Sequence, residues 1–182
     1  MSEIDSKLKN DFLISEKLFS EGKYEDSIKK YQEILVDYPK LLSAINNMGR
    51  SYQQLNQLDE SIECFKKCLL IEPNKIIIIN NIVTTYIKKK DYINAIVYVT
   101  NSLIIDDNQI DMIEIKTKCL MKLDLKVEAN LFLHPYLVKY PNNDTLNALS
   151  GKILIALNQH EDGLKALKKG AGFIEFDEDK IR

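Results

Sequence analysis

The sequence of 182 residues has only six glycines and four prolines, which are the residues that build tight turns. An all-β fold needs many such turns, so their scarcity argues against a sandwich or a barrel. Long apolar runs are also missing, and runs such as Ile76–Ile79 are far too short to span a bilayer. There are only three cysteines, an odd number without framework spacing, which indicates a reducing compartment.

The chain also lacks an excess of either charge, with a formal net charge of -2. This balance gives no general footprint for nucleic acid. The amino-terminal stretch MSEIDSKLKNDF is polar and of mixed charge, unlike a signal peptide. With 45% hydrophobic and 29% charged residues, the composition is typical of a folded soluble protein. We therefore predict a cytoplasmic protein without membrane insertion or a nucleic-acid partner.

A repeat is present: the segment INNMGRSY at 45–52 returns 34 residues later as INNIVTTY. Rows of this length begin without insertion at Leu8, Leu42, Ile76, Ile110 and Asp144. Four columns each keep one character. Two are large and apolar (Leu18, Tyr52, Tyr86, Leu120, Leu154; and Tyr31, Phe65, Val99, Leu133, Leu167), one is small (Ser27, Ser61, Ala95, Ala129, Gly163), and one holds three prolines (Pro39, Pro73, Asp107, Pro141). Four columns in register predict a structural period.

Each row predicts two antiparallel helices, because apolar residues recur at steps of three and four. The break between the helices is a fifth column, and four of its five residues tolerate a left-handed backbone: Gly22, Asn56, Asp124 and Asn158, with Lys90 as the exception. The small column lets the two helices of a row cross closely. Since one pair cannot bury its apolar face alone, the pairs are expected to stack into a solenoid.

This pattern resembles the tetratricopeptide repeat through Gly49, Tyr52, Ser61, Phe65 and Pro73. The resemblance covers roughly residues 8–175 and implies an all-α, right-handed solenoid of antiparallel helix pairs. It divides the chain into a leader at 1–7, repeats at 8–41, 42–75, 76–109 and 110–143, a degenerate fifth repeat at 144–172, and a tail or linker at 173–182. Rows four and five are expected to be weaker, because Lys116 and Ser150 stand where other rows are apolar.

The resemblance implies a module that binds another protein or a peptide, with the first helix of each pair lining a concave groove. Two asparagine pairs lie in register there, Asn46/Asn47 and Asn80/Asn81. They resemble the asparagine ladder in the repeat arrays of protein O-GlcNAc transferases, which implies bonds to the backbone of an extended peptide. Asparagine offers both donors and acceptors for this. The alternative is that these asparagines are merely solvated polar positions.

Cations on the same helices form a possible basic stripe suited to an acidic segment or a free carboxylate. They are Arg50, Lys88, Lys118 and Lys122. The alternative is again ordinary solvated charge. Chaperone-binding tetratricopeptide domains have a carboxylate clamp that needs lysine and arginine at set positions. Here those positions hold Phe12, Glu16, Asn47, Ile77 and Asn81, none of which is a cation. The predicted groove residues are therefore Asn46, Asn47, Arg50, Asn80, Asn81, Lys88, Lys118 and Lys122.

No catalytic motif is recognisable: the sequence has no Gly-rich phosphate loop, no nucleophile elbow and no metalloprotease helix. Cys64 and Cys68 lie four residues apart, but a zinc site needs three or four ligands. We interpret them as buried structural cysteines. The prediction is a protein that is not an enzyme and needs no metal or cofactor.

The end of the chain, KKGAGFIEFDEDKIR, does not fit the repeat. A solenoid needs a polar cap over its last apolar face, and this tail is short for one. Three alternatives follow. The tail folds back as a cap, or it is a linker into a further domain, or the open C-terminal end of the solenoid stacks against another copy of the chain. The second alternative implies a recruiting region of a larger enzyme, because such arrays often precede glycosyltransferases, sulfotransferases or iron-dependent oxygenases. The third implies a self-assembling scaffold that forms homo-oligomers through its C-terminal end.

Overall fold

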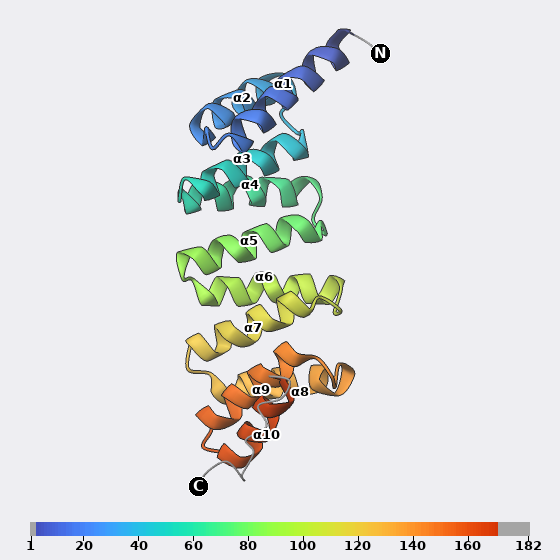
Figure 1. Cartoon of the computed structure of the whole chain (residues 1–182). Helices are drawn as coiled ribbons and strands as arrows, with labels where there is room; N and C mark the ends of the chain where they lie inside the picture. The colour runs from blue at the N-terminus through green and yellow to red at the C-terminus, as the bar shows by residue number, and fades with distance from the viewer. Residues whose placement is uncertain (1–2, 171–182) are drawn as a thin grey trace. The chain divides into compact units, whose positions relative to one another are not determined.

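The computed structural model describes residues 3–170, and within this range it has ten α-helices and no strand (Figure 1). The predicted all-α class is confirmed. The helices are α1 (Glu3–Ser20), α2 (Tyr24–Asp37), α3 (Leu42–Gln54), α4 (Leu58–Ile71), α5 (Ile76–Lys89), α6 (Tyr92–Ile105), α7 (Ile110–Lys122), α8 (Lys126–Lys139), α9 (Asp144–Ala156) and α10 (His160–Gly170). One boundary differs: α1 already begins at Glu3, inside the stretch predicted as a leader.

The 34-residue period is confirmed by where the helices begin. The helices α3, α5, α7 and α9 begin at the predicted first residue of their rows, and α2, α4, α6, α8 and α10 also start 34 residues apart. The predicted break column has positive φ angles of 60° to 77° in all five rows, including Lys90. In every row the residue after the break donates its backbone N–H to the carbonyl of the large apolar column, as from Gln57 to Tyr52 at 2.9 Å. This closes each first helix in the same way.

The small column lies where the two helices of a pair cross. Ser27, Ser61, Ala95 and Ala129 are fully buried. In the fifth row the crossing is tighter still: a Cβ on Gly163 would lie 3.0 Å from the carbonyl oxygen of Gly151. α9 and α10 therefore meet backbone to backbone.

The chain divides into two compact units, Met1–Ile105 and Asp106–Arg182. In the first unit each helix from α1 to α6 packs against the next, and α3 also contacts α5 (Figure 1). Its largest fully buried side chains include Tyr31, Phe65, Ile78 and Ile82. These come from first and second helices alike, so the core of this unit is continuous through the stack.

In the second unit α7 packs on α8, α8 on α9 and α9 on α10, and α7 also contacts α9. The core here includes Ile113, Leu133 and Ile153. Lys116 replaces an apolar residue of other rows and lies with its ammonium 4.5 Å from the centroid of the Phe132 ring. Burial lowers the pKa of Lys116 below its ordinary value. Loss of water is unfavourable for a charge, but that row four is a weaker repeat stays a prediction.

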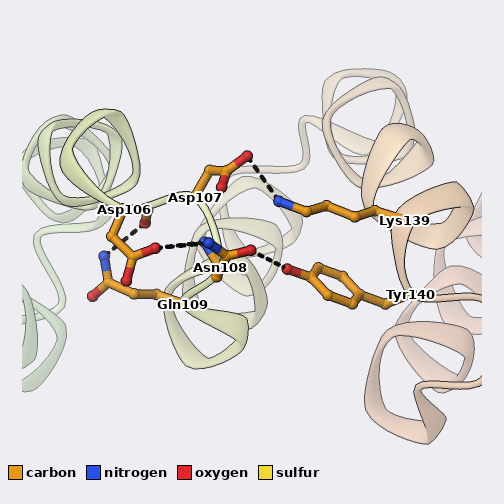
Figure 2. Close-up of polar contacts among 6 residues, drawn as sticks. All are labelled: Asp106, Asp107, Asn108, Gln109, Lys139 and Tyr140. Atoms are coloured by element: carbon orange, nitrogen blue, oxygen red, sulfur yellow. Dashed lines mark hydrogen bonds and ion pairs between the residues drawn. The ribbon is translucent and has the colours of Figure 1, made fainter.

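The segment before α7 replaces the proline of other rows with hydrogen bonds (Figure 2). Asp106 accepts bonds from the backbone N–H of Asn108 at 3.0 Å and from its side chain at 3.1 Å. Lys139 pairs with Asp107 at 2.9 Å, and the Tyr140 hydroxyl donates to Asn108 Oδ1 at 2.8 Å. Polar contacts to the end of α8 thus hold a turn that a proline forms elsewhere.

Between residues 3 and 170, no helix combines the length and the apolar character needed to cross a membrane. The predicted tail at 173–182 and the last two residues of the predicted fifth repeat lie outside the described residues. The three alternatives for the tail therefore stay predictions, as does assembly through the C-terminal end.

Candidate peptide-binding groove

One face of the first unit is formed by the first helices α1, α3 and α5. On α1, Phe12, Glu16 and Phe19 follow steps of four and three, and on α3 Asn47, Arg50 and Gln53 follow steps of three with Asn46 adjacent, so they share one side of each helix. We call the following set the groove face: Phe12, Glu16, Phe19, Asn46, Asn47, Arg50, Gln53, Asn81 and Thr84. Two neighbouring hollows open on it, and Glu16 lines both.

The larger hollow has a volume of about 370 Å³ and a largely apolar wall. Its lining consists of Leu8, Lys9, Phe12, Leu13, Glu16, Leu41 and Ser43. The Phe12 ring meets the buried Tyr31 ring edge-on, with 5.7 Å between centroids. Leu13 is 64% exposed although it is a large apolar residue. The hollow therefore has the size and the chemistry to accept an apolar side chain.

The smaller hollow has a volume of about 90 Å³ and is lined by Glu16, Phe19, Tyr31, Asn47 and Arg50. The Arg50 guanidinium lies 4.9 Å from the centroid of the Phe19 ring, a cation–π contact that holds the side chain over α1. Burial raises the pKa of the Tyr31 hydroxyl, and a hydrogen bond with Asn47 acts in the opposite direction. The Tyr31 hydroxyl is therefore neutral at physiological pH, next to the positive charge of Arg50.

The asparagines form a chain of hydrogen bonds between α5 and α3. Asn81 Nδ2 donates to Asn46 Oδ1 at 2.9 Å, and Asn46 Nδ2 donates to Asn47 Oδ1 at 3.2 Å. Asn80 instead accepts a bond from the Ser102 hydroxyl of α6 at 2.7 Å. The two pairs are thus in register in the sequence but differ in their contacts.

The difference between Asn46 and Asn80 has a local cause. The residue that corresponds to Ser102 in the second row is Cys68, whose thiol lies 3.7 Å from the carbonyl oxygen of Leu42. Thiols are weak donors, so Asn46 has no hydroxyl partner of that kind on its own second helix. It bonds Asn81 of the next first helix instead.

A further polar contact between α3 and α5 was not predicted. Gln53 Nε2 donates to Thr85 Oγ1 at 2.8 Å and lies 3.3 Å from Thr84 Oγ1. Gln53 and Thr85 are 32 residues apart, and Asn46 and Asn81 are 35 apart, so neither pair falls in one 34-residue column. The only signal in the sequence was the polar character of both helices at these positions.

The predicted cations are all exposed, but they differ in their surroundings. Arg50 lines the smaller hollow, and Lys88 lies near the end of α5. Lys118 forms an ion pair with Glu114 on α7, which partly offsets its charge, and Lys122 is the last residue of that helix. Lys118 and Lys122 belong to the second unit, so a basic stripe through all four cations stays a prediction.

Within the described range, no group of three or more His, Cys, Asp or Glu side chains could hold a metal ion. Cys64, Cys68 and Cys119 are free and buried. Burial raises the pKa of the Cys64 thiol to about 11, of Cys68 to about 12 and of Cys119 to about 11. Thiols with such values are protonated at neutral pH and therefore poor nucleophiles. They serve as core residues.

Comparison with known families gives one match: the sequence model of the tetratricopeptide repeat matches residues 43–75. This is the second row, whose residues carry the resemblance described above. A search of curated proteins found no match.

Solved structures match over most of the chain. A crystal structure of MamA has 13% identity and a TM-score of 0.78, and the match covers 90% of this chain and 89% of that one. Residues 41 to the end of MamA from Desulfovibrio magneticus RS-1 have 14% identity and a TM-score of 0.78, covering 97% and 98%. YrrB, described as a TPR protein with an unusual peptide-binding site, has 17% identity and a TM-score of 0.71, covering 88% and 82%. At these identities the likeness shows the fold, which is that of tetratricopeptide repeats.

Proposed function

We propose that this chain, which has the tetratricopeptide-repeat fold, is a protein-interaction module that holds an extended peptide on the groove face of α1, α3 and α5. The observation that carries the proposal is the apolar larger hollow beside a chain of bonded asparagines. Such a surface can take one apolar side chain and the polar backbone next to it. In this proposal the chain acts in the cytoplasm as an adaptor and not as an enzyme.

The backbone of the peptide would be held by the side chains of Asn47, Asn46 and Asn81. An amide side chain donates and accepts, so it can pair with the C=O and N–H of a peptide whatever its side chains. The bonds among the three asparagines fix their orientation before a ligand arrives. A preorganised site loses less conformational entropy on binding. Asn80, which bonds Ser102, would act mainly by fixing α5 against α6.

An apolar side chain of the peptide would enter the larger hollow, where Phe12 and Leu13 offer most of the contact. Arg50 at the smaller hollow, with Lys88 on α5, would favour an acidic residue or a free carboxylate beside that anchor. Lys118 and Lys122, which belong to the second unit, would favour an acidic segment there. YrrB, which has the same fold, is described as having a peptide-binding site, and this supports a peptide as the class of ligand.

The proposal is tested by selecting peptides from a random display library on the full chain and measuring their binding by fluorescence anisotropy. The double variant Asn47→Ala/Asn81→Ala should bind the selected peptides at least about tenfold more weakly, because each lost amide bond contributes about 1 kcal/mol. Its thermal midpoint should fall by only a few degrees, roughly 5 °C or less.

Two matched variants make the result specific. Phe12→Ala removes part of the larger hollow and should weaken peptides with an apolar anchor most. Asn142→Ala replaces an exposed asparagine of the loop before α9 and should leave binding unchanged. Peptides that bind the double variant as tightly as the unaltered chain would exclude the groove face as their site.

A further inference from the structure

The second unit has a hollow of its own on its first helices, α7 and α9, with a volume of about 280 Å³. The residues of α9 that line it are Asp144, Thr145, Ala148, Leu149 and Lys152. They stand in the same five columns of the repeat as the residues of α1 that line the larger hollow, which are Leu8, Lys9, Phe12, Leu13 and Glu16. Both units therefore form a hollow from the same positions of a first helix.

The two hollows differ in charge. The column that holds Glu16 in the first row holds Lys118 in the fourth and Lys152 in the fifth, and both lysines line the hollow of the second unit. Glu114 also lines it and forms an ion pair with Lys118, and Asp144 is the first residue of α9. Among residues 3–170, Lys152 has no ion-pair partner. An acidic side chain in this hollow can therefore pair with the ammonium group of Lys152.

The chain itself has an acidic segment just beyond this hollow. Residues 173–179 read FIEFDED, with four acidic residues, three apolar residues and no cation. This segment lies outside the described residues, but the point from which it starts is well defined, because Gly170 lines the hollow. A Cβ on Gly170 would lie 2.5 Å from the Asp144 carbonyl oxygen and 2.9 Å from the Ala148 Cα, so the end of α10 touches the backbone of α9.

The segment is long enough to reach the two lysines. An extended chain advances about 3.3 Å for each residue, so Glu175 can lie up to about 17 Å from Gly170. Gly170, Lys118 and Lys152 line one hollow of about 280 Å³, which is smaller than that reach.

We propose that residues 173–179 bind in the hollow of their own second unit. The acidic side chains pair with Lys152 and Lys118, and Phe176 covers Ala148 and Leu149. This inference rests on the proposed function in one respect, namely that the first helices hold peptides. It adds a second binding site and its ligand, and it means that an acidic segment of another protein must displace residues 173–179 before it can bind there.

The short connection makes this binding effective even if the contacts are weak. A segment joined by a few residues has an effective concentration of roughly 1 mM at its site. At that value a segment with a dissociation constant of about 100 µM occupies the hollow about ten times more often than it leaves it empty. An external peptide of the same sequence should then bind about tenfold more weakly than it would to an open hollow.

The test measures, by fluorescence anisotropy, how a labelled peptide with the sequence FIEFDED binds to the whole chain. A neutral-tail chain is made by Glu175→Gln, Asp177→Asn, Glu178→Gln and Asp179→Asn. This chain should bind the peptide at least about tenfold more tightly than the unaltered chain, because its own segment no longer competes. Added salt should weaken the binding, since it screens the charges.

One variant and a control locate the peptide. Lys152→Glu in the neutral-tail chain should weaken binding at least about tenfold. Lys67→Glu makes the same charge change at an exposed position of α4, in the first unit, and should leave binding unchanged. Both lysines are exposed, so both variants should fold, which circular dichroism checks. Binding that Lys152→Glu leaves unchanged, or no binding to the neutral-tail chain, would overturn the hollow as an acidic site. Equal binding to the unaltered and neutral-tail chains would overturn its occupation by residues 173–179.

A second comparison separates this inference from the proposed function. Asn47→Ala/Asn81→Ala in the neutral-tail chain should leave binding of the FIEFDED peptide unchanged, because both asparagines belong to the first unit. A loss there would place the peptide on the groove face and overturn the site in the second unit. Peptides selected on the groove face test the proposed function independently, so either proposal can fail alone.

Sedimentation velocity shows whether the segment binds within one chain. The unaltered chain should be a monomer at the concentrations of the binding assay. A dimer that is lost in the neutral-tail chain would mean that the segment binds the hollow of a second copy, and it would overturn binding within the same chain.

Discussion

The two units build the same helix pair from different contacts. In the first unit α3 and α4, the pair of the second row, cross where a Cβ on Gly49 would meet the Phe65 side chain at 2.8 Å. In the second unit α9 and α10 approach until Gly151 and Gly163 meet through their backbones. The period fixes where helices begin in both. How closely neighbouring helices approach depends on single residues at the crossing.

Buried sulfur also distinguishes the units. The first unit contains Cys64 and Cys68 on α4, and the second contains Cys119 on α7. All three are nearly inaccessible to solvent, so a thiolate at any of them would lose its hydration. At alkaline pH the free energy of unfolding should therefore decrease more through the thiols of the first unit than through that of the second.

The largest predicted effect is this alkaline loss of stability. The pKa of each thiol is raised in the folded state, to about 11, 12 and 11 for Cys64, Cys68 and Cys119, so its contribution is complete below the unfolded pKa of about 9. It is lost as the pH rises toward the folded values, because the unfolded chain releases these protons first. The raised pKa corresponds to at most about 3 kcal/mol for Cys64 and for Cys119, and to at most about 4 kcal/mol for Cys68.

Urea unfolding followed by circular dichroism at about pH 8 and about pH 10.5 measures this loss. The double variant Cys64→Ala/Cys68→Ala should reduce the pH-dependent part more than Cys119→Ala does. Tyrosines also titrate in this range, but they are the same in every variant and cancel in the comparison. An equal decrease in all variants would show that the thiols do not cause it.

Nearly all of the helical fold could be predicted from the sequence, because each repeated column reflects a local requirement such as a helix end or a close helix crossing. The break column is an example: Lys90 has a φ of 60° although lysine does not favour it. The backbone bond from Asp91 to Tyr86 at 2.9 Å is the same as in the other rows, so the capping pattern overrides the residue type.

The candidate site was less predictable, since its contacts run diagonally between columns. Register alone suggested equal roles for Asn46 and Asn80, yet Asn80 bonds Ser102 and Asn46 bonds Asn81. Which asparagine bonds which neighbour depends on how far one helix is displaced along its axis relative to the next. This displacement cannot be read from a single sequence. Phe12 stood in the sequence only as a member of the clamp frame, and Phe19 stood in no predicted site. The structure places Phe12 against Tyr31 and Phe19 beside Tyr31 and Arg50.

A smaller effect tests the backbone crossing of the second unit. A Cβ on Gly151 would lie 2.8 Å from the Gly163 carbonyl oxygen and 2.8 Å from the Leu167 nitrogen. Gly151→Ala should therefore lower the free energy of unfolding by about 2 kcal/mol, because backbone atoms cannot move aside cheaply.

The matched change in the first unit is Gly49→Ala. Its Cβ would meet the ring of the buried Phe65 at 2.8 Å and the Cys64 Cβ at 3.0 Å, which are side-chain atoms and not backbone atoms. The loss there should be about 1 kcal/mol or less, partly offset by the better helix propensity of alanine. Urea unfolding compares both variants. A larger loss for Gly49→Ala would contradict the claim that the second unit has the less adaptable crossing.

The smallest effect has the opposite sign and concerns the small column. Ser61 is fully buried, and its hydroxyl has no hydrogen-bond partner among residues 3–170. Ala129 occupies the same column in the second unit, and Ala95 does so in the third row, so the site accepts a methyl group. Ser61→Ala should raise the free energy of unfolding by about 1 kcal/mol, because a buried polar group without a partner is unfavourable.

Ser27→Ala is the control, since Ser27 lies in the same column but its hydroxyl is 3.3 Å from that of Ser51. This variant loses a hydrogen bond and should be destabilised by about 0.5 kcal/mol. Ser51 keeps its bond to the Asn47 carbonyl oxygen at 3.0 Å, which limits the loss. Opposite signs for two serines in one column would show that the column requires small volume, and that the hydroxyl helps only where a neighbouring row supplies its partner. If both variants are destabilised alike, the Ser61 hydroxyl is bonded in solution, and the unit gains nothing from an alanine there.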